Sequence, residues 1–380
     1  MKKLVKCLAV AFFVLSASSL SYAKGIFIQP GARAAGYGQA FTAVADDLTA
    51  IFWNPAGLAY QKDTQAMMSA FYINYDATSN GSMFNKFETS AILPFMAFSL
   101  PIDQSKKTIL AAGIYISGGG GGKLKQLVAP DTYAKIEGQY SYMIYNVSLA
   151  REIYDNLSVA VGVDLINMNE KNEITNLPPL NTDYSRSGYG VQGNVGVMYK
   201  PLKKLSTGII FRSGSSISLS DVENKDKHFK YPMTIEGGFA YDLFDRLTFA
   251  CAVAHAEYSW TSADYVDTTI IKVGAEYRAT DKLSLLAGFY NDPNIINTSV
   301  LYDPSEEKAA NVTNLNMYNM RYFNIGVGYK FTKSFNAVLL YSRSYTQEVS
   351  AIDPFPPNLQ TTYKYPINFL KMDLNYKFGI

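Results

Sequence analysis

The sequence predicts an all-β protein, a transmembrane antiparallel β-barrel of about fourteen strands with an N-terminal hatch in its lumen. Three observations support this prediction. Apolar and polar residues alternate repeatedly from about residue 65 to the end of the chain. Short and long connections take turns between these alternating stretches, and residues 25–60 have a different composition, dominated by small residues.

Residues 1–23 are expected to be a secretory signal. Lys2, Lys3 and Lys6 surround the start of a short apolar run, and Ser21 and Ala23 offer small side chains for cleavage. The apolar run is much shorter than the roughly 20 residues that a membrane-spanning helix needs. The mature chain is therefore expected to start near Lys24.

The barrel strands are predicted from their period of two. Between Thr269 and Tyr277, Ile271 and Val273 share one face, whereas Lys272 and Glu276 share the other. The same division recurs at residues 157–165, 233–241, 323–331 and 369–378. One face is aliphatic or aromatic, and the other mixes glycine with polar and charged residues, as expected of a wall between lipid and a wet lumen.

The connections predict the strand number. Six short turns are expected at residues 103–106, 154–156, 201–204, 244–245, 280–282 and 332–334. Seven longer loops are expected near residues 76–88, 117–139, 169–187, 219–230, 260–267, 292–317 and 347–365. Together they imply about fourteen strands, an even number as in bacterial barrels, with the short turns on the periplasmic side.

Residues 24–62 are predicted to form the hatch, and residues 63–380 the barrel. The hatch sequence contains Asp46-Asp47 and the motif Asn54-Pro55-Ala56-Gly57. Asn54 is a candidate helix cap, and Pro55 suits a first helical position. Composition alone leaves a plain N-terminal subdomain or linker equally open.

The hatch resembles that of the FadL-type outer-membrane transporter family for long-chain fatty acids and aromatic hydrocarbons. The resemblance rests on the glycines, alanines and Arg33 of residues 31–45, on Asp46-Asp47, and on residues 54–58. It extends in order through barrel motifs such as Phe211-Arg212-Ser213. It implies a fourteen-stranded barrel in the outer membrane, capture of a hydrophobic molecule outside, and lateral release through the wall.

Two other functions remain open. Trp53 before the Asn-Pro-Ala motif also occurs in PorV-type partners of a secretion system, which predicts a structural or secretion-partner barrel instead. A porin for polar solutes is the third alternative, against which the hatch argues. For the transporter, we expect a monomer that contacts outer-membrane lipid and carries a fatty acid or hydrocarbon.

Candidate ligand contacts follow from apolar hatch residues and lumen-facing cations. The apolar candidates are Phe27, Phe41, Phe52 and Trp53. The cationic candidates for an acid group are Arg212, Lys272 and Arg278, each of which could equally form a structural ion pair with Glu236 or Glu276.

A lateral gate is predicted beside the third strand, near residues 109–116. Gly113 lies inside that strand, and a run that includes Gly118, Gly119 and Gly120 follows it. Glycine weakens strands and marks bulges. The alternative is an external loop without a gating role.

The sequence offers no enzyme, cofactor or metal site. The mature chain has one cysteine, Cys251, and two histidines, His228 and His255. The Gly-rich run from Ser117 fails the spacing of a phosphate loop. The net charge of +2 argues against nucleic acid as a partner.

Overall fold

The computed structural model describes residues 29–79, 87–129, 132–176, 181–220, 227–262, 265–295, 319–346, 349–352, 360–364 and 367–378. The predicted signal and the candidate Phe27 lie outside these residues. Three short helical segments come first: α2 (Ala32–Gly36), α3 (Ala50–Trp53) and the 3-10 helix η2 (Pro55–Tyr60). None of the helices in the described ranges is long and apolar enough to cross a membrane.

The strands follow in one series. They are β1 (Thr64–Ser79), β2 (Phe87–Pro101), β3 (Thr108–Ala129), β4 (Thr132–Tyr154), β5 (Leu157–Thr175), β6 (Thr182–Leu202), β7 (Leu205–Arg212), β8 (Ser215–Ser220), β9 (Lys227–Tyr231), β10 (Met233–Phe244), β11 (Leu247–Glu257), β12 (Thr268–Arg278), β13 (Leu283–Asp292), β14 (Met320–Lys330), β15 (Phe335–Thr346), β16 (Val349–Ile352), β17 (Gln360–Lys364) and β18 (Ile367–Phe378).

These segments build a closed antiparallel barrel of 14 strands, which confirms the predicted fold. β8 and β9 continue β7 and β10 beyond a short interruption, and β16 and β17 continue β15 and β18 in the same way. Pro232, which has no N–H to donate, separates β9 from β10. The barrel closes where β1 pairs with β18, from Thr64 opposite Phe378 to Tyr75 opposite Ile367.

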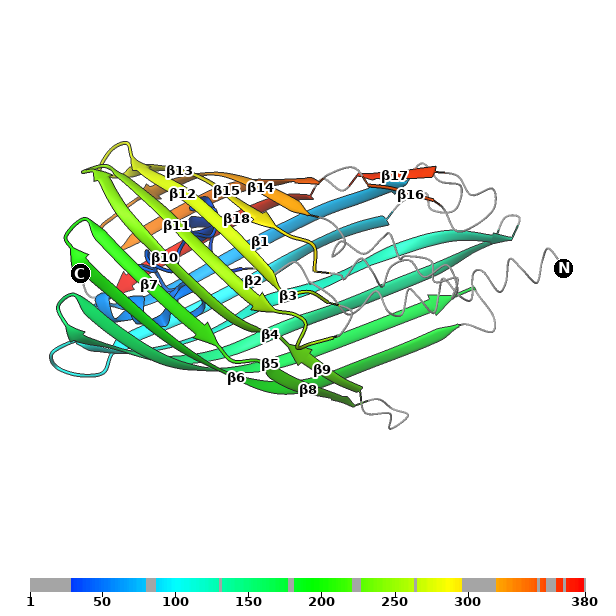
Figure 1. Cartoon of the computed structure of the whole chain (residues 1–380), viewed down its shortest axis with the longest axis horizontal. Helices are drawn as coiled ribbons and strands as arrows, with labels where there is room; N and C mark the ends of the chain where they lie inside the picture. The colour runs from blue at the N-terminus through cyan, green and yellow to red at the C-terminus, as the bar shows by residue number, and fades with distance from the viewer. Residues whose placement is uncertain are drawn as a thin grey trace.

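All six expected short turns are present, and they gather at one end of the barrel, the left end in Figure 1. The expected long loops at residues 117–139 and 169–187 are wrong. β3 and β4 continue through the first as a hairpin and pair from Gly118 opposite Tyr142 to Leu127 opposite Tyr133. β5 and β6 likewise continue through most of the second, up to the pair of Ile174 with Thr182. In the first, a run of glycines hides the side-chain alternation, but main-chain hydrogen bonds form a ladder without it.

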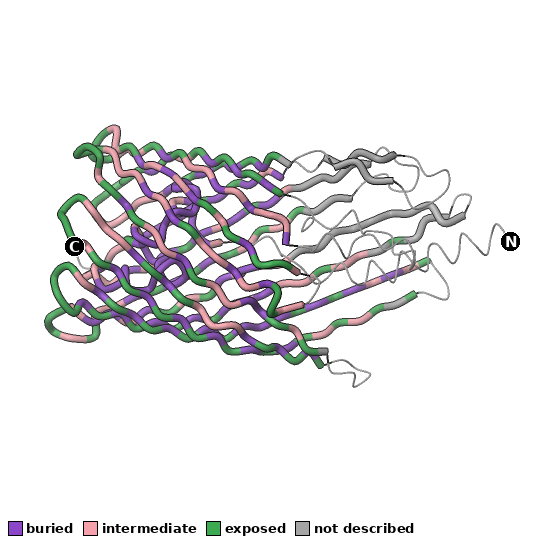
Figure 2. Tube along the Cα trace, viewed as in Figure 1, coloured by how far each residue is buried: buried purple, intermediate pink, exposed green. Residues whose placement is uncertain are grey.

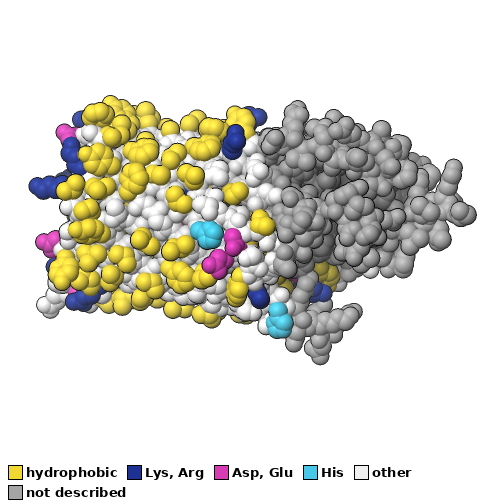
Figure 3. All heavy atoms as spheres, viewed as in Figure 1, with side chains coloured by type: hydrophobic (Ala, Val, Ile, Leu, Met, Phe, Trp, Pro, Cys, Tyr) yellow, Lys and Arg dark blue, Asp and Glu magenta, His cyan; other side chains and the backbone are white. Residues whose placement is uncertain are grey.

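The predicted faces are confirmed. Ile271 and Ile325 are 53% and 63% exposed, whereas their neighbours Lys272 and Asn324 are buried on the lumen side. Figure 2 shows this alternation along the strands, and Figure 3 shows an apolar outer surface with basic side chains near its two ends. The outer face is therefore suited to lipid.

The N-terminal segment, residues 29–63, lies inside this barrel, and we call it the hatch (Figure 1). Its helix α2 packs against β12 to β15 and β18, and η2 packs against β3 to β6. Small residues let the hatch backbone approach the wall, and the two together make one buried core.

Candidate transport site

Asn54 ties the hatch to itself and to the wall. Its side-chain oxygen accepts a hydrogen bond from the N–H of Ala56 at 3.2 Å, which caps η2 as predicted, and Pro55 occupies the first turn. Its side-chain nitrogen donates to the carbonyls of Thr42 and of Val197 in β6, each at 3.0 Å. Asn54 is fully buried, and its amide is hydrogen-bonded to main-chain groups of both the hatch and the wall, as expected of a buried polar side chain.

Glycines of the wall make room for the hatch backbone. A Cβ on Gly288 in β13 would lie 2.0 Å from the main-chain nitrogen of Gly38. A Cβ on Gly196 in β6 would lie 2.3 Å from the side-chain oxygen of Asn54. The glycines on the polar face of the strands therefore allow a close approach of two backbones.

Arg33 links the hatch to β12. Its guanidinium forms an ion pair with Glu276 at 2.7 Å, and Tyr37 donates its hydroxyl hydrogen to the same carboxylate at 2.9 Å. On the hatch side, Arg33 pairs with Asp46 and lies 3.9 Å from Asp47. The acidic pair of the hatch motif thus surrounds one arginine.

Asp47 also organises the start of α3. Its carboxylate accepts a hydrogen bond from the N–H of Thr49 at 2.9 Å and another from the hydroxyl of that residue. Burial raises the pKa of Asp47 to about 7, and the repulsion of Asp46 acts in the same direction, although Arg33 opposes both. Asp47 is therefore a titratable group of the hatch near neutral pH.

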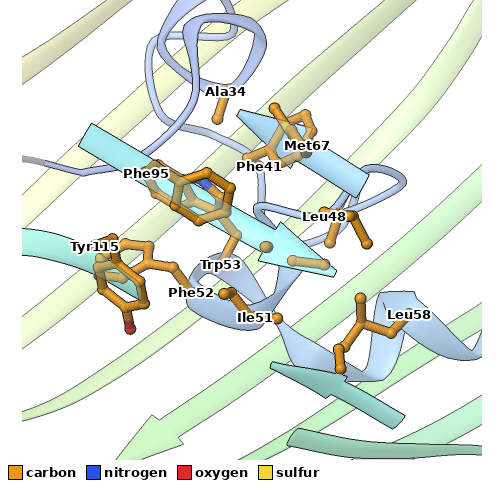
Figure 4. Close-up of a cluster of buried hydrophobic side chains, with 14 of the residues drawn as sticks. Ala34, Phe41, Leu48, Ile51, Phe52, Trp53, Leu58, Met67, Phe95 and Tyr115 are labelled. Atoms are coloured by element: carbon orange, nitrogen blue, oxygen red, sulfur yellow. The ribbon is translucent and has the colours of Figure 1, made fainter. Parts of the chain in front are cut away.

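The three described apolar candidates lie together in the hatch (Figure 4). The rings of Phe41 and Phe52 lie 6.3 and 5.0 Å from Trp53, and the indole of Trp53 donates to the carbonyl of Pro30 at 3.0 Å. Phe41 and Trp53 are almost completely buried within the hatch. Phe52 instead reaches the wall, where its ring lies 5.8 Å from that of Tyr115 in β3.

The three cationic candidates have different surroundings. Lys272 is buried and donates to Glu236 at 2.7 Å, so it forms the structural pair that the sequence left open. Arg278 contacts Thr248 and the carbonyl of Asp245 at the end with the tight turns. Of the three, only Arg212 has a buried side-chain nitrogen without a hydrogen bond among the described residues.

Arg212 in β7 lies over the ring of Phe52, with its guanidinium carbon 4.6 Å from the ring centre. Its Nη2 atom is buried and has no hydrogen-bond partner among the described residues. The guanidinium interacts electrostatically with Asp164, and its Nη2 remains a donor that an acid group could use.

An aromatic pocket lies between the hatch and the wall on the other side of the lumen. It is lined by Ala35, Gln39, Phe71, Tyr290, Asn324, Ser342, Phe369 and Lys371. Tyr322 extends it, because its ring stacks on Tyr290 at 4.5 Å and on Phe369 at 5.6 Å. The Nζ of Lys371 lies 4.4 Å from the ring centre of Phe71 and donates to the carbonyl of Gln29 at 2.8 Å.

The sequence analysis missed this pocket. Its signal was nevertheless present, since Tyr290, Tyr322 and Phe369 occupy lumen-facing positions of their strands. Large aromatic residues are unexpected on a polar face unless they pack or bind something.

The wall has a break in pairing between β2 and β3. Phe95 pairs with Tyr115, and the next pair is Glu88 with Lys123, so residues 89–94 and 116–122 have no partner across this strand pair. β3 carries a bulge here, because Ile116 and Gly118 pair with consecutive residues of β4 while Ser117 pairs with none. Tyr231 donates its hydroxyl hydrogen to the side chain of Ser117 at 3.1 Å.

Three of the predicted gate residues lie within this break, and the fourth lies outside it. Gly118, Gly119 and Gly120 lie within it and remain paired with β4. Gly113 lies outside it, since it pairs with Ala97. A Cβ on Gly113 would lie 2.4 Å from the terminal methyl of Ile51, so this glycine serves the contact between wall and hatch.

Comparisons with known proteins show which solved structures share this architecture. No family model matches the chain, and no curated protein matches its sequence. Among solved structures, a FadL homologue of Pseudomonas aeruginosa is 15% identical, with a TM-score of 0.68, over 93% of this chain and 100% of that one.

Two hydrocarbon transporters share the same architecture. The toluene transporter TodX of Pseudomonas putida is 14% identical, with a TM-score of 0.65, over 88% of this chain and 95% of its own. The toluene transporter TbuX of Ralstonia pickettii is 15% identical, with a TM-score of 0.60, over 93% and 99%. The chain therefore has the fold of the FadL-type outer-membrane transporters.

Proposed function

We propose that the protein carries hydrophobic molecules across the outer membrane and releases them sideways through the wall between β2 and β3. The observation that carries this proposal is the break in pairing at residues 89–94 and 116–122. An unpaired main-chain group in the hydrocarbon region costs several kcal/mol, so such a break persists only where other groups cover it.

The surroundings of the break suit an apolar cargo. Phe95 and Tyr115 form the edge of the break nearer the tight turns, with ring centres 6.0 Å apart. Phe52 of the hatch packs on Tyr115 (Figure 4). The aromatic residues near Phe369 add to the apolar surface of the lumen, and one of them, Phe71 in β1, pairs with Leu93 of the break. The cargo classes named for the similar structures, toluene and other monoaromatic hydrocarbons, fit such aromatic surfaces.

Deletion of Ser117 tests the proposal. The deletion removes the one extra residue of β3, so six residues of each strand would face each other and the flanking pairs would keep their register. We expect the barrel to fold and insert, and uptake of labelled toluene and oleate by cells without another such transporter to fall about tenfold or more.

The matched control is Ser117→Ala, which removes the hydrogen bond from Tyr231 but keeps the bulge. This variant should transport as the parent does. Normal uptake by a well-folded deletion variant would rule out exit between β2 and β3.

A further inference from the structure

The outer surface carries a row of hydrogen-bond donors at the margin of the apolar belt that lies farther from the tight turns. It consists of Asn291 in β13, Arg321 in β14, Arg343 in β15 and Asn368 in β18, and we call it the outer donor row. Asn291 pairs directly with Arg321, and Arg343 pairs with Asn368. The row therefore crosses four neighbouring strands of one sheet.

These side chains face away from the lumen. Arg321 has the parity of the exposed Phe323 and Ile325, and Arg343 has that of the exposed Leu339 and Tyr341. Both arginines are themselves exposed. The lumen has no access to the row, so its charges play no part in the transport path proposed above.

The height of the row corresponds to a lipid boundary. β14 runs from Lys330 beside a tight turn to Arg321, a distance of about 30 Å at about 3.3 Å per residue. With a strand tilt of about 40°, this matches the height of about 25 Å expected for the apolar belt. The aromatic residues Tyr341 and Tyr345 flank Arg343 at the same margin, as in an interfacial girdle.

The row offers donors without matching acceptors. Within the described part of the chain, the side chains of Arg321 and Arg343 have no ion pair and no hydrogen-bond partner, and that of Arg343 lies over the ring of Tyr345. The oxygen of Asn368 accepts from the hydroxyl of Tyr341 at 2.8 Å, and that of Asn291 accepts from the N–H of Ile271 at 2.8 Å. Both amides thus present their N–H groups outward.

No acidic residue faces outward on these four strands within residues 283–292, 320–330, 335–346 and 367–378. Two guanidinium groups at a membrane boundary, accompanied only by N–H donors, match a phosphate. We propose that the outer donor row binds the phosphorylated sugar headgroup of a lipid A-type glycolipid in the outer leaflet. Arginine provides paired N–H donors for phosphate oxygens, and the amides add further hydrogen bonds.

The test uses the purified full-length barrel and native mass spectrometry with added lipid A. We expect the parent protein to retain bisphosphorylated lipid A and to bind the fully dephosphorylated form much more weakly. Replacing both arginines, Arg321→Gln with Arg343→Gln, should weaken binding about thirtyfold, since each basic residue near an anionic lipid surface contributes a factor of about five.

Two further variants complete the test. Lys330→Gln with Lys333→Gln removes two exposed charges at the opposite end and should leave binding unchanged. Arg321→Lys with Arg343→Lys keeps the charge but loses the paired donors, so binding should be intermediate. Equal binding of phosphorylated and dephosphorylated lipid A by the parent would overturn the proposal, and this comparison does not require the glutamine variant to fold. Unchanged binding of lipid A by a folded glutamine variant would also overturn it.

Discussion

The side-chain amide of Asn54 donates to the carbonyl of Val197 at 3.0 Å and thereby fastens the hatch to the sixth strand of the wall. The same amide donates to the carbonyl of Thr42. One buried side chain therefore sets the position of two hatch turns relative to the barrel. The consequences of this contact, and of three others, can be measured.

Replacing Asn54 with alanine should loosen the hatch. The carbonyl of Thr42 would lose its side-chain donor, at a cost of about 1–3 kcal/mol for an unsatisfied buried group, and the carbonyl of Val197 would lose its link to the hatch. Single-channel conductance in planar bilayers should rise or become noisy. Asn54→Asp keeps the acceptor for Ala56 but lacks both donations, so it should behave like the alanine variant. An aspartate variant as quiet as the parent would show that the tether is unimportant.

Alanine at Gly288 should displace the hatch, because its Cβ would lie 2.0 Å from the nitrogen of Gly38. Overpacking of this kind typically costs about 1–3 kcal/mol. The thermal unfolding midpoint of the purified barrel should fall, and protease should cut the hatch more readily. The control is Gly237→Ala, whose nearest contact of 3.8 Å is ordinary. Equal stability of the two variants would contradict the close approach.

Ionisation of Asp47 should weaken the hatch as pH rises. Its folded-state pKa of about 7 lies above the ordinary value of 3.8, so the folded state holds the proton more tightly than the unfolded state. This contribution to stability is fully present below pH 4, falls between about pH 4 and pH 7, and is lost above pH 7.

Conductance noise from hatch movement should therefore increase between pH 5 and pH 8 in the parent. Asp47→Asn keeps an oxygen acceptor for Thr49 but cannot ionise, so its noise should vary less with pH. The pH response of the two proteins, recorded in the same bilayers, checks this. An identical response would assign the effect to another group.

Arg212→Met should separate two classes of cargo. The Nη2 atom of Arg212 lacks a hydrogen-bond partner, and the side chain lies over Phe52. Methionine retains an apolar contact with this ring but removes the charge. We expect uptake of oleate to fall about fivefold or more while uptake of toluene persists. Lys272→Met is a poor substitute, since it would leave Glu236 buried without its partner.

The sequence predicted the barrel because a period of two recurs in many of the strands and the turn residues are local signals. The lumen-facing positions of Lys272 and Glu276 and the exposed positions of Ile271 and Ile325 all followed from this period. The cap at Asn54 followed as well, since the motif Asn-Pro is itself local.

The pocket and the break in the wall could not be located in the same way. Tyr322 in β14 meets Phe369 in β18 only because β15 pairs with both strands, and that register depends on the whole barrel. The glycine run indicated a weak strand. Because glycine has no side chain, however, the sequence there shows no alternation of apolar and polar residues from which pairing could be predicted. Only the register shows that Ser117, rather than Gly113, is the residue at which β3 departs from regular pairing.

The seam between the first and last strands has a consequence for assembly. Asp373 in β18 accepts hydrogen bonds from the N–H groups of Ala32 and Arg33 at 2.7 and 2.9 Å, while Lys371 in the same strand donates to the carbonyl of Gln29. β18 therefore docks on the hatch as well as on β1. The glycines of the wall leave little space between the strands and the hatch backbone. We therefore expect the barrel to close around a hatch that is already in place, so that the hatch serves as a template for the closure of the sheet.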